Sequence, residues 1–168
     1  MPHPAEDSLD TLAARLGEAL LARQQAVATA ESCTGGWVAM ALTAIPGSSR
    51  WFERGFVTYS NEAKQEMLGV RATTLNSHGA VSAATVTEMA AGALQHSRAH
   101  WSVAISGIAG PDGGSADKPV GTVWFAWQGP DGRQHGERRQ FDGDRREVRE
   151  QATRHAIEGL LDLLDNCI

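Results

Sequence analysis

The chain is poor in cysteine and lysine and has no long apolar run. Its two cysteines, Cys33 and Cys167, cannot form the disulfide framework of a small secreted domain, so we expect a reduced, cytoplasmic protein. No apolar run approaches the roughly 20 residues that span a membrane. Residues 1–7 lack the basic start and apolar centre of a signal peptide, and we expect them to form a short disordered lead.

Charge and length narrow the class of protein further. The formal net charge of −5 argues against a nucleic acid as partner, because the phosphate backbone attracts basic surfaces. Hydrophobic residues make up 42% of the 168 residues and charged residues 21%, which is ordinary for a globular protein. We expect one domain over residues 8–168.

Lysine is scarce, and its placement is informative. Thirteen arginines stand beside only Lys64 and Lys118. An arginine-favouring genome accounts for the scarcity but not for the positions, since each lysine falls in a segment that stands out on other grounds. Lysine can be tuned to act as a base near neutral pH, whereas arginine cannot.

Helical and strand patterns alternate through the first two thirds of the chain, and a hairpin comes late. Spacing, capping residues and turn signals predict helices over about 8–23, 36–43, 61–68, 83–97 and 144–165. They predict strands over about 26–30, 51–60, 101–106, 120–127 and 133–141, with turns at 75–80 and 130–132. This order predicts a three-layer α/β/α domain with a mixed, mostly parallel sheet.

The most informative segment is Thr29-Ala30-Glu31-Ser32-Cys33-Thr34-Gly35-Gly36, where a strand should turn into a helix. Such a junction can hold the Ser32 hydroxyl as a nucleophile, with the N–H groups of Thr34, Gly35 and Gly36 free to stabilise an oxyanion or bind phosphate. In the structural alternative Ser32 or Thr34 is a helix N-cap and the glycines allow tight packing.

Lys64 is the candidate base for Ser32, which is a poor nucleophile without one. Ser60 or Asn61 should cap the helix that carries Lys64. The helix start and partial burial would lower the pKa of the amine, whereas Glu62 and Glu66 would raise it, so a lowered pKa is a hypothesis. Tyr59 could orient Lys64 or relay a proton. The alternatives are a solvated lysine paired with a nearby glutamate and a tyrosine at the rim of the core.

A glycine-rich loop follows a later strand, at the edge where open α/β sheets bind ligands. It begins Ser106-Gly107-Ile108-Ala109-Gly110-Pro111-Asp112-Gly113-Gly114 and continues to Lys118-Pro119-Val120-Gly121-Thr122. Glycines allow a substrate close to the backbone. The segment fits neither the P-loop nor the dinucleotide fingerprint. A surface loop without a ligand is the alternative.

Other features favour structural interpretations. Cys33 is expected to be a small buried thiol, because no nearby histidine could activate it. His96 and His100 lack a third ligand, so no metal is expected. The arginines of residues 138–149 interleave with acidic residues, which favours a salt-bridged, solvated helix face.

Five ordered motifs together resemble the CinA C-terminal domain family, over essentially all of residues 8–165. They are Ala30–Gly36, Pro46-Gly47-Ser48-Ser49, the segment from Gly55 through Tyr59-Ser60-Asn61 to Lys64, Gly79-Ala80-Val81-Ser82, and Ser106–Gly114 with Lys118–Val123. The family includes nicotinamide-mononucleotide amidohydrolases.

The resemblance implies a three-layer α/β/α fold and hydrolysis of the nicotinamide-mononucleotide carboxamide to the acid and ammonia, in pyridine-nucleotide recycling. By motif match, Ser32 is the implied nucleophile and Lys64 and Tyr59 assist it; no metal or other cofactor is required.

Candidate substrate contacts follow from the same motifs together with the helix starts and loops. They are Thr34, Gly35, Gly36, Ser48, Ser49, Asn61, Ser106, Gly107, Gly110 and Gly113.

Two rival functions stay open. A nucleotide-binding module without catalysis would keep the glycine loops but could dispense with Ser32 and Lys64. A DNA-associated protein is suggested only by the family's link to competence, and the acidic charge disfavours it. Five tryptophans and an edge strand are compatible with a homodimer.

Overall fold

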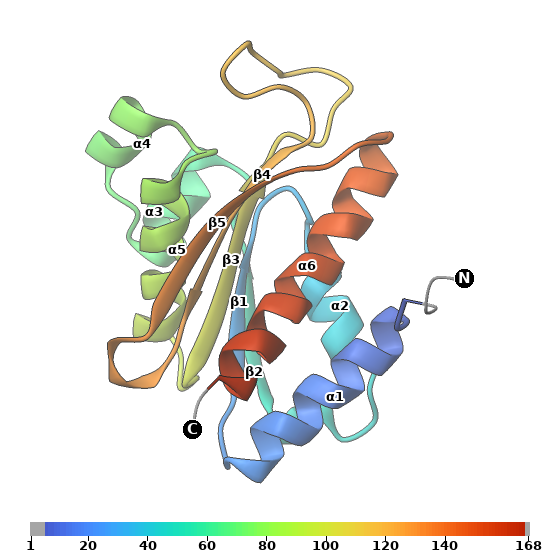
Figure 1. Ribbon diagram of the computed structural model, residues 1–168. Coiled ribbons are helices and arrows are strands. Elements are labelled where there is room, and N and C mark those ends of the chain that lie inside the picture. The colour runs from blue at the N-terminus through green and yellow to red at the C-terminus, as the bar shows by residue number, and fades with distance from the viewer. Residues whose placement is uncertain (1–5, 167–168) are drawn as a thin grey trace.

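A computed structural model describes residues 6–166 and contains one five-stranded sheet flanked by helices (Figure 1). The strands are β1 Val27–Glu31, β2 Phe52–Val57, β3 Trp101–Gly107, β4 Thr122–Gln128 and β5 Gln134–Gln140. The α-helices are α1 Leu9–Ala22, α2 Trp37–Thr43, α3 Asn61–Leu68, α4 Ala72–His78, α5 Ala83–Gln95 and α6 Arg145–Asp165. Two short 3₁₀ turns are η1 Ser48–Arg50 and η2 Pro130–Gly132.

The sheet has the order β2-β1-β3-β4-β5 and is mixed. β1 pairs in parallel with β2 and with β3, whereas β4 is antiparallel to both β3 and β5. Four strands therefore point one way and β4 alone runs against them. The expected mixed, mostly parallel sheet is confirmed in this sense.

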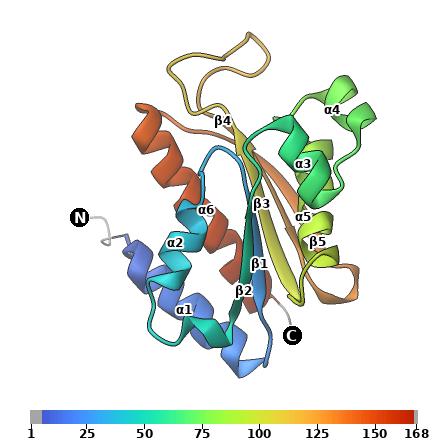
Figure 2. The ribbon, with the colours of Figure 1, turned by 180° about the vertical axis from the view of Figure 1, so that it is seen from behind.

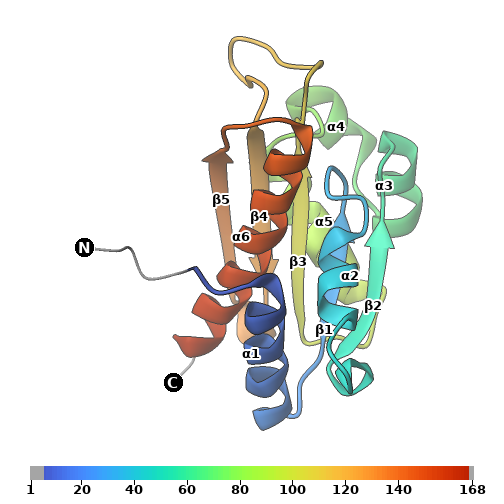
Figure 3. The same ribbon diagram turned by 90° about the vertical axis from the view of Figure 1, so that its right-hand side faces the viewer.

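Helices cover both faces of the sheet, which gives the expected three layers. α1, α2 and α6 lie on one face and α3, α4 and α5 on the other (Figure 2). β1 is buried along its whole length, as a central strand covered on both faces should be. Figure 1 sees the sheet close to edge-on and separates the two helical layers, whereas Figure 3 looks onto the face that α1, α2 and α6 cover.

Local sequence signals explain most of the helix starts. The side chain of Ser8 accepts a hydrogen bond from the Thr11 N–H, and Asp144 forms a capping box with Glu147. Ser60 caps α3 in the same way through the Ala63 N–H. No helix among residues 6–166 is long and apolar enough to span a membrane.

Two sequence expectations need correction. The expected turn at 75–80 is largely helical, because Ala72–His78 forms α4. The strand expected over 51–60 ends at Val57, and residues 58–60 instead carry the chain over the sheet edge into α3. Of the expected lead, residues 1–5 lie outside the described part, while the Asp7 carboxylate pairs with Arg15 at 2.8 Å.

Candidate active site

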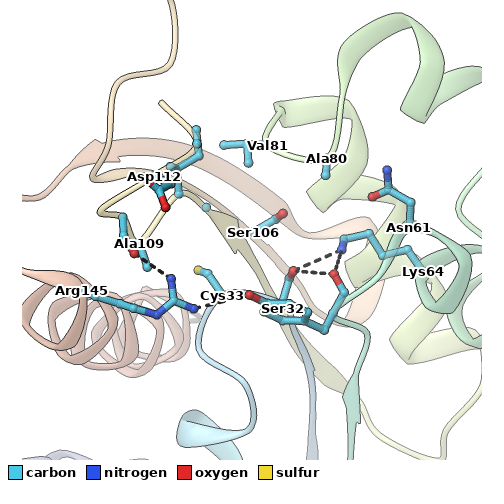
Figure 4. Close-up of a pocket in the computed structure, with 15 residues that line it drawn as sticks. Ser32, Cys33, Asn61, Lys64, Ala80, Val81, Ser106, Ala109, Asp112 and Arg145 are labelled. Carbon is cyan, nitrogen blue, oxygen red and sulfur yellow. Dashed lines mark hydrogen bonds between the residues drawn. The ribbon is translucent and has the colours of Figure 1, made fainter. Parts of the chain in front are cut away.

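The carboxyl ends of β1, β2 and β3 meet at one edge of the sheet, where a cavity of about 300 Å³ opens. Strand ends, the turn before α5 and the start of α6 all contribute to its wall (Figure 4). The lining residues are Ser32, Cys33, Tyr59, Asn61, Lys64, Ala80, Val81, Ser106–Gly110, Asp112, Gly113 and Arg145. Open α/β sheets bind ligands at this position.

Ser32 and Lys64 meet in this cavity, although 31 residues separate them in the sequence. The Lys64 amine lies 3.1 Å from the Ser32 hydroxyl oxygen, and the two side chains point toward each other (Figure 4). Lys64 is 1% exposed and Ser32 is 7% exposed. A solvated lysine and a serine helix cap are therefore both wrong, since the N-cap of α2 is Gly36.

Main-chain carbonyls hold the Lys64 nitrogen beside Ser32. Its nitrogen donates to the carbonyl oxygens of Thr58 and Tyr59 at 2.9 and 3.0 Å. The amine also donates to the Ser32 oxygen. When neutral, it keeps two N–H groups for the two carbonyls, and its lone pair is free to face the Ser32 hydroxyl and take its proton. No carboxylate among the described residues forms an ion pair with Lys64.

Burial lowers the pKa of Lys64, because the ammonium loses its hydration. Attraction to a Cys33 thiolate would act in the opposite direction. Burial also raises the pKa of the Cys33 thiol to about 12, so that thiolate is absent near neutral pH. Desolvation therefore governs Lys64, and Cys33 is the inert buried thiol that the sequence predicts.

Tyr59 contributes through its main chain rather than through its phenol. Its carbonyl accepts from Lys64 and, at 3.5 Å, from the Ser32 hydroxyl. The phenol is mostly exposed and accepts from Arg145 at 3.4 Å. The expectation that Tyr59 orients Lys64 fits this carbonyl contact, whereas no contact joins the phenol to Lys64 for a proton relay.

The glycine loop forms the wall opposite α3. Ser106, which is 1% exposed, and Gly107 end β3 inside the cavity, and Gly110 and Gly113 continue its lining. Gly110 and Gly113 have φ angles of 86° and 98°, which side chains disfavour, so glycine keeps the backbone close to the cavity. Asn61 reaches the cavity from the first turn of α3.

Arg145 and Arg149 are the residues that sequence reasoning missed. Arg145 lines the cavity and donates to the Gly110 carbonyl at 2.8 Å. Arg149, one helical turn later, donates to the carbonyls of Cys33 and Thr34 at 3.0 and 3.3 Å. The expected salt-bridged helix face is wrong for both. Their spacing of four, which places both on one face of the helix, was the available signal.

Comparison with known proteins places this geometry in a family. The model of the CinA C-terminal domain matches residues 9–164. The chain belongs to the CinA C-terminal domain family.

The alignments with relatives of this CinA-family chain cover nearly its whole length. It is 59% identical over 155 residues to the nicotinamide-nucleotide amidohydrolase PncC of Escherichia coli K12, with 92% of this chain and 94% of the relative covered. The Pseudomonas putida protein of the same name is 55% identical, with 94% and 98% covered. The competence/damage inducible protein CihA of Agrobacterium tumefaciens has a crystal structure that superposes with a TM-score of 0.91 at 47% identity, covering 96% of this chain and 99% of that one.

Three of the expected substrate contacts in this CinA-family chain lie outside the Ser32 cavity. Thr34, Gly35 and Gly36 line a separate hollow with Trp37 and Arg149. The Gly35 N–H donates to the Ser32 carbonyl at 3.0 Å and is already engaged. Their expected role as oxyanion donors for Ser32 therefore needs correction.

The start of α2 is not available to a phosphate, because Glu31 already occupies it. The fully buried Glu31 carboxylate accepts from the N–H groups of Val38 and Ala39 at 2.9 and 3.0 Å. It also accepts from the Thr34 hydroxyl at 2.6 Å. The chain thus supplies its own anion at this helix start.

Ser48 and Ser49 lie near the amino-terminal ends of β1 and β2, whereas the cavity lies at the carboxyl ends of these strands. With Arg50 they form η1, and Trp51 separates η1 from β2. The Trp51 carbonyl accepts from the Val27 N–H at the start of β1. Because β1 and β2 are parallel, the Ser32 cavity lies at the other end of both strands. Within one chain, neither serine therefore lies near Ser32.

Proposed function

We propose that the protein hydrolyses the carboxamide of nicotinamide mononucleotide to nicotinate mononucleotide and ammonia, with Ser32 as nucleophile and Lys64 as base. The observation that carries the proposal is the 3.1 Å contact between the Lys64 amine and the Ser32 hydroxyl, two buried side chains in the wall of the cavity. Relatives at 54–59% identity over most of the chain bear the name nicotinamide-nucleotide amidohydrolase, which supports this substrate class.

Acylation follows from the geometry. The neutral Lys64 amine takes the Ser32 proton as the serine oxygen attacks the amide carbon, which forms a tetrahedral oxyanion. The resulting ammonium returns its proton to the leaving nitrogen. The C–N bond breaks, ammonia departs, and the nicotinoyl group remains as an ester on Ser32.

Deacylation uses the same base. Lys64 takes a proton from water as the water oxygen attacks the ester carbon, and then returns that proton to the Ser32 oxygen as the acid leaves. Cys33 and residues of the glycine loop line the cavity, and their unengaged main-chain N–H groups are our candidates for stabilising the oxyanion.

Arg145 is our candidate for the substrate phosphate. Apart from Lys64, it is the one cationic side chain among the described residues that lines the cavity. A guanidinium recognises phosphate oxygens through parallel N–H donors. The exposed Tyr59 ring beside it could stack on the cationic pyridinium ring of the substrate.

Ammonia release from nicotinamide mononucleotide tests the proposal. We expect Ser32→Ala and Lys64→Met each to lower kcat by at least about 10³-fold, because each removes one partner of the nucleophile–base pair. Ser49→Ala is the matched control, because this exposed serine precedes β2, at the end of the strands away from the cavity. This variant should keep wild-type kinetics.

The outcomes separate the proposed enzyme from its main rival. Full activity of Ser32→Ala would remove the nucleophile assignment. Saturable binding of the mononucleotide by the wild type without ammonia release would instead favour a binding module.

A further inference from the structure

Lys118, the second of the two lysines, joins two walls of the cavity that are distant in the sequence. One wall is the glycine loop between β3 and β4, which projects beyond the sheet between α4 and α6 (Figure 1). The other is the turn between α4 and α5, which contributes Ala80 and Val81. The Lys118 amine donates to the His78 carbonyl at 2.9 Å and so connects loop and turn.

The turn is a firm anchor for this contact. The Gly79 carbonyl accepts from the Ser82 hydroxyl at 2.9 Å and from the Thr85 hydroxyl at 2.6 Å, which fixes it to the first turn of α5. Gly79 has a φ of 78°, and a Cβ there would lie 3.4 Å from the Lys118 nitrogen. Glycine therefore allows both the turn and the approach of the ammonium.

The loop is held at its base and on its own side by other bonds. Ile108 and Gly121 close the base, since the Gly121 N–H donates to the Ile108 carbonyl at 2.7 Å. Arg138 on β5 donates to the Asp117 carbonyl at 2.9 Å, next to Lys118. Among the hydrogen bonds of residues 6–166, the Lys118 contact alone links this loop to the segment from α4 to α5.

We propose that Lys118 is a positioning residue that sets the separation of these two walls and thereby the affinity for substrate. The inference rests on the proposed function for the identity of the substrate. The contact between Lys118 and His78 does not depend on that function. An ammonium suits the place, because the carbonyls at the C-terminal end of α4 carry partial negative charge. Lys118 does not line the cavity, so it acts on substrate only through the walls that it joins.

Steady-state kinetics with nicotinamide mononucleotide and three variants test the inference. Lys118→Met keeps the aliphatic stem and removes the donor, and we expect KM to rise roughly 5- to 30-fold with kcat within about twofold of wild type. Lys118→Arg keeps a cationic donor and should bring KM back to within about threefold. Arg138→Gln is the matched control, because it removes the donor to the Asp117 carbonyl but leaves the bond between Lys118 and His78 in place. Its KM should stay within about twofold of wild type.

Hydrogen exchange on the substrate-free protein supplies a readout that does not depend on turnover. Lys118→Met should speed exchange in both segments 79–82 and 107–121, whereas Arg138→Gln should speed it only in the loop. If the wild type releases no ammonia, the proposed function fails and the exchange result still decides the bridge.

Three results would overturn the inference. They are an unchanged KM with unchanged exchange in Lys118→Met, a loss of kcat at constant KM, and an equal rise of KM in Arg138→Gln. The second would mean that Lys118 acts on the chemical step, and the third that general loop order, not the bridge, controls binding.

Discussion

At the scale of single residues, Lys64 combines almost complete burial with an unusual set of partners. Two main-chain carbonyls and one hydroxyl surround its nitrogen, and none of them can neutralise an ammonium. A buried charge without a counter-ion is unfavourable, so the fold shifts the lysine toward its neutral form. The same shift that prepares a base for Ser32 also makes stability depend on pH.

The direction of that dependence follows from the lowered pKa of Lys64. Between this pKa and the value of about 10.4 in the unfolded chain, only the unfolded chain holds the proton, so stability rises with pH. Below the folded-state pKa both states are protonated, and the full penalty of the buried ammonium remains. The free energy of unfolding of wild type minus that of Lys64→Met should therefore increase from pH 7 to about pH 10.5.

Urea unfolding at several pH values measures this difference. Taking the difference between the two proteins cancels the titrations of groups that do not interact with Lys64. A difference that stays constant over the range would contradict a lowered pKa of Lys64.

At the scale of elements, a buried carboxylate, rather than the side chain of the N-cap residue, pairs with the N–H groups at the start of α2. Gly36 offers no side chain to the helix, and Glu31 accepts from the Val38 and Ala39 N–H groups instead. Because Glu31 directly precedes Ser32, the same contact fixes the turn that carries the nucleophile. Glu31→Ala should leave these donors unpaired and lower the free energy of unfolding by about 2–4 kcal/mol.

Chemical denaturation of Glu31→Ala beside Thr34→Val gives the comparison. Thr34→Val removes only one of the three donors to the carboxylate and should lower stability by about 1 kcal/mol. Equal losses in the two variants would show that the helix-start contact is not the main contribution of Glu31.

α5 approaches α3 so closely that only glycine fits at their contact. A Cβ on Gly92 would lie 2.0 Å from the carbonyl oxygen of Leu68, the last residue of the helix that carries Lys64. In an exposed helix, glycine to alanine stabilises by roughly 0.5–1 kcal/mol, whereas overpacking typically costs 1–3 kcal/mol. The clash involves backbone that cannot rotate away, so the second effect dominates.

Gly92→Ala should therefore be less stable than wild type and should lose activity as α3 shifts. Thermal unfolding and ammonia release measure the two effects. Ala91→Gly at the adjacent exposed position isolates helix propensity, with an expected loss of roughly 0.5–1 kcal/mol. A more stable Gly92→Ala would refute the close contact.

Elements could be predicted from the sequence where local signals agree with packing. The nucleophile turn, the Lys64 helix and the cap at Ser60 follow from local spacing and capping residues. α4 could not be predicted, because its threonines and asparagine favour turns and its support is tertiary. Glu88 on α5 accepts from the Thr74 hydroxyl at 2.5 Å and from the Arg71 N–H at 2.9 Å.

The site was predictable in part for the same reason. Ser32 and Lys64 stand in distinctive local motifs, whereas Arg145 and Arg149 lie among acidic residues that fit a solvated helix equally well. Only the packing of α6 beside the sheet directs both arginines at main-chain carbonyls. Ser48 and Ser49 failed because a motif does not reveal at which end of the sheet its residues lie.

At the scale of the whole molecule, part of the positive charge is engaged within the fold. Arg138, Arg145 and Arg149 donate to main-chain carbonyls around the site, and Arg54 and Arg71 pair with carboxylates. The chain as a whole has a formal net charge of −5 and should repel the DNA phosphates. Duplex DNA is bound through released counterions, which requires clustered free cations on the protein.

We therefore expect no saturable binding of a fluorescent DNA duplex at 50 mM salt, as measured by anisotropy with up to about 10 μM protein. This range is sufficient, because specific DNA-binding proteins bind at far lower concentrations. This test bears on the name of relatives such as CihA, which connects the fold with competence or damage. Binding that weakens steeply with added salt would show a basic face that acts on DNA. DNA binding that nicotinamide mononucleotide blocks would place the DNA contact at the cavity. It would also contradict the argument that the negative net charge keeps DNA from binding.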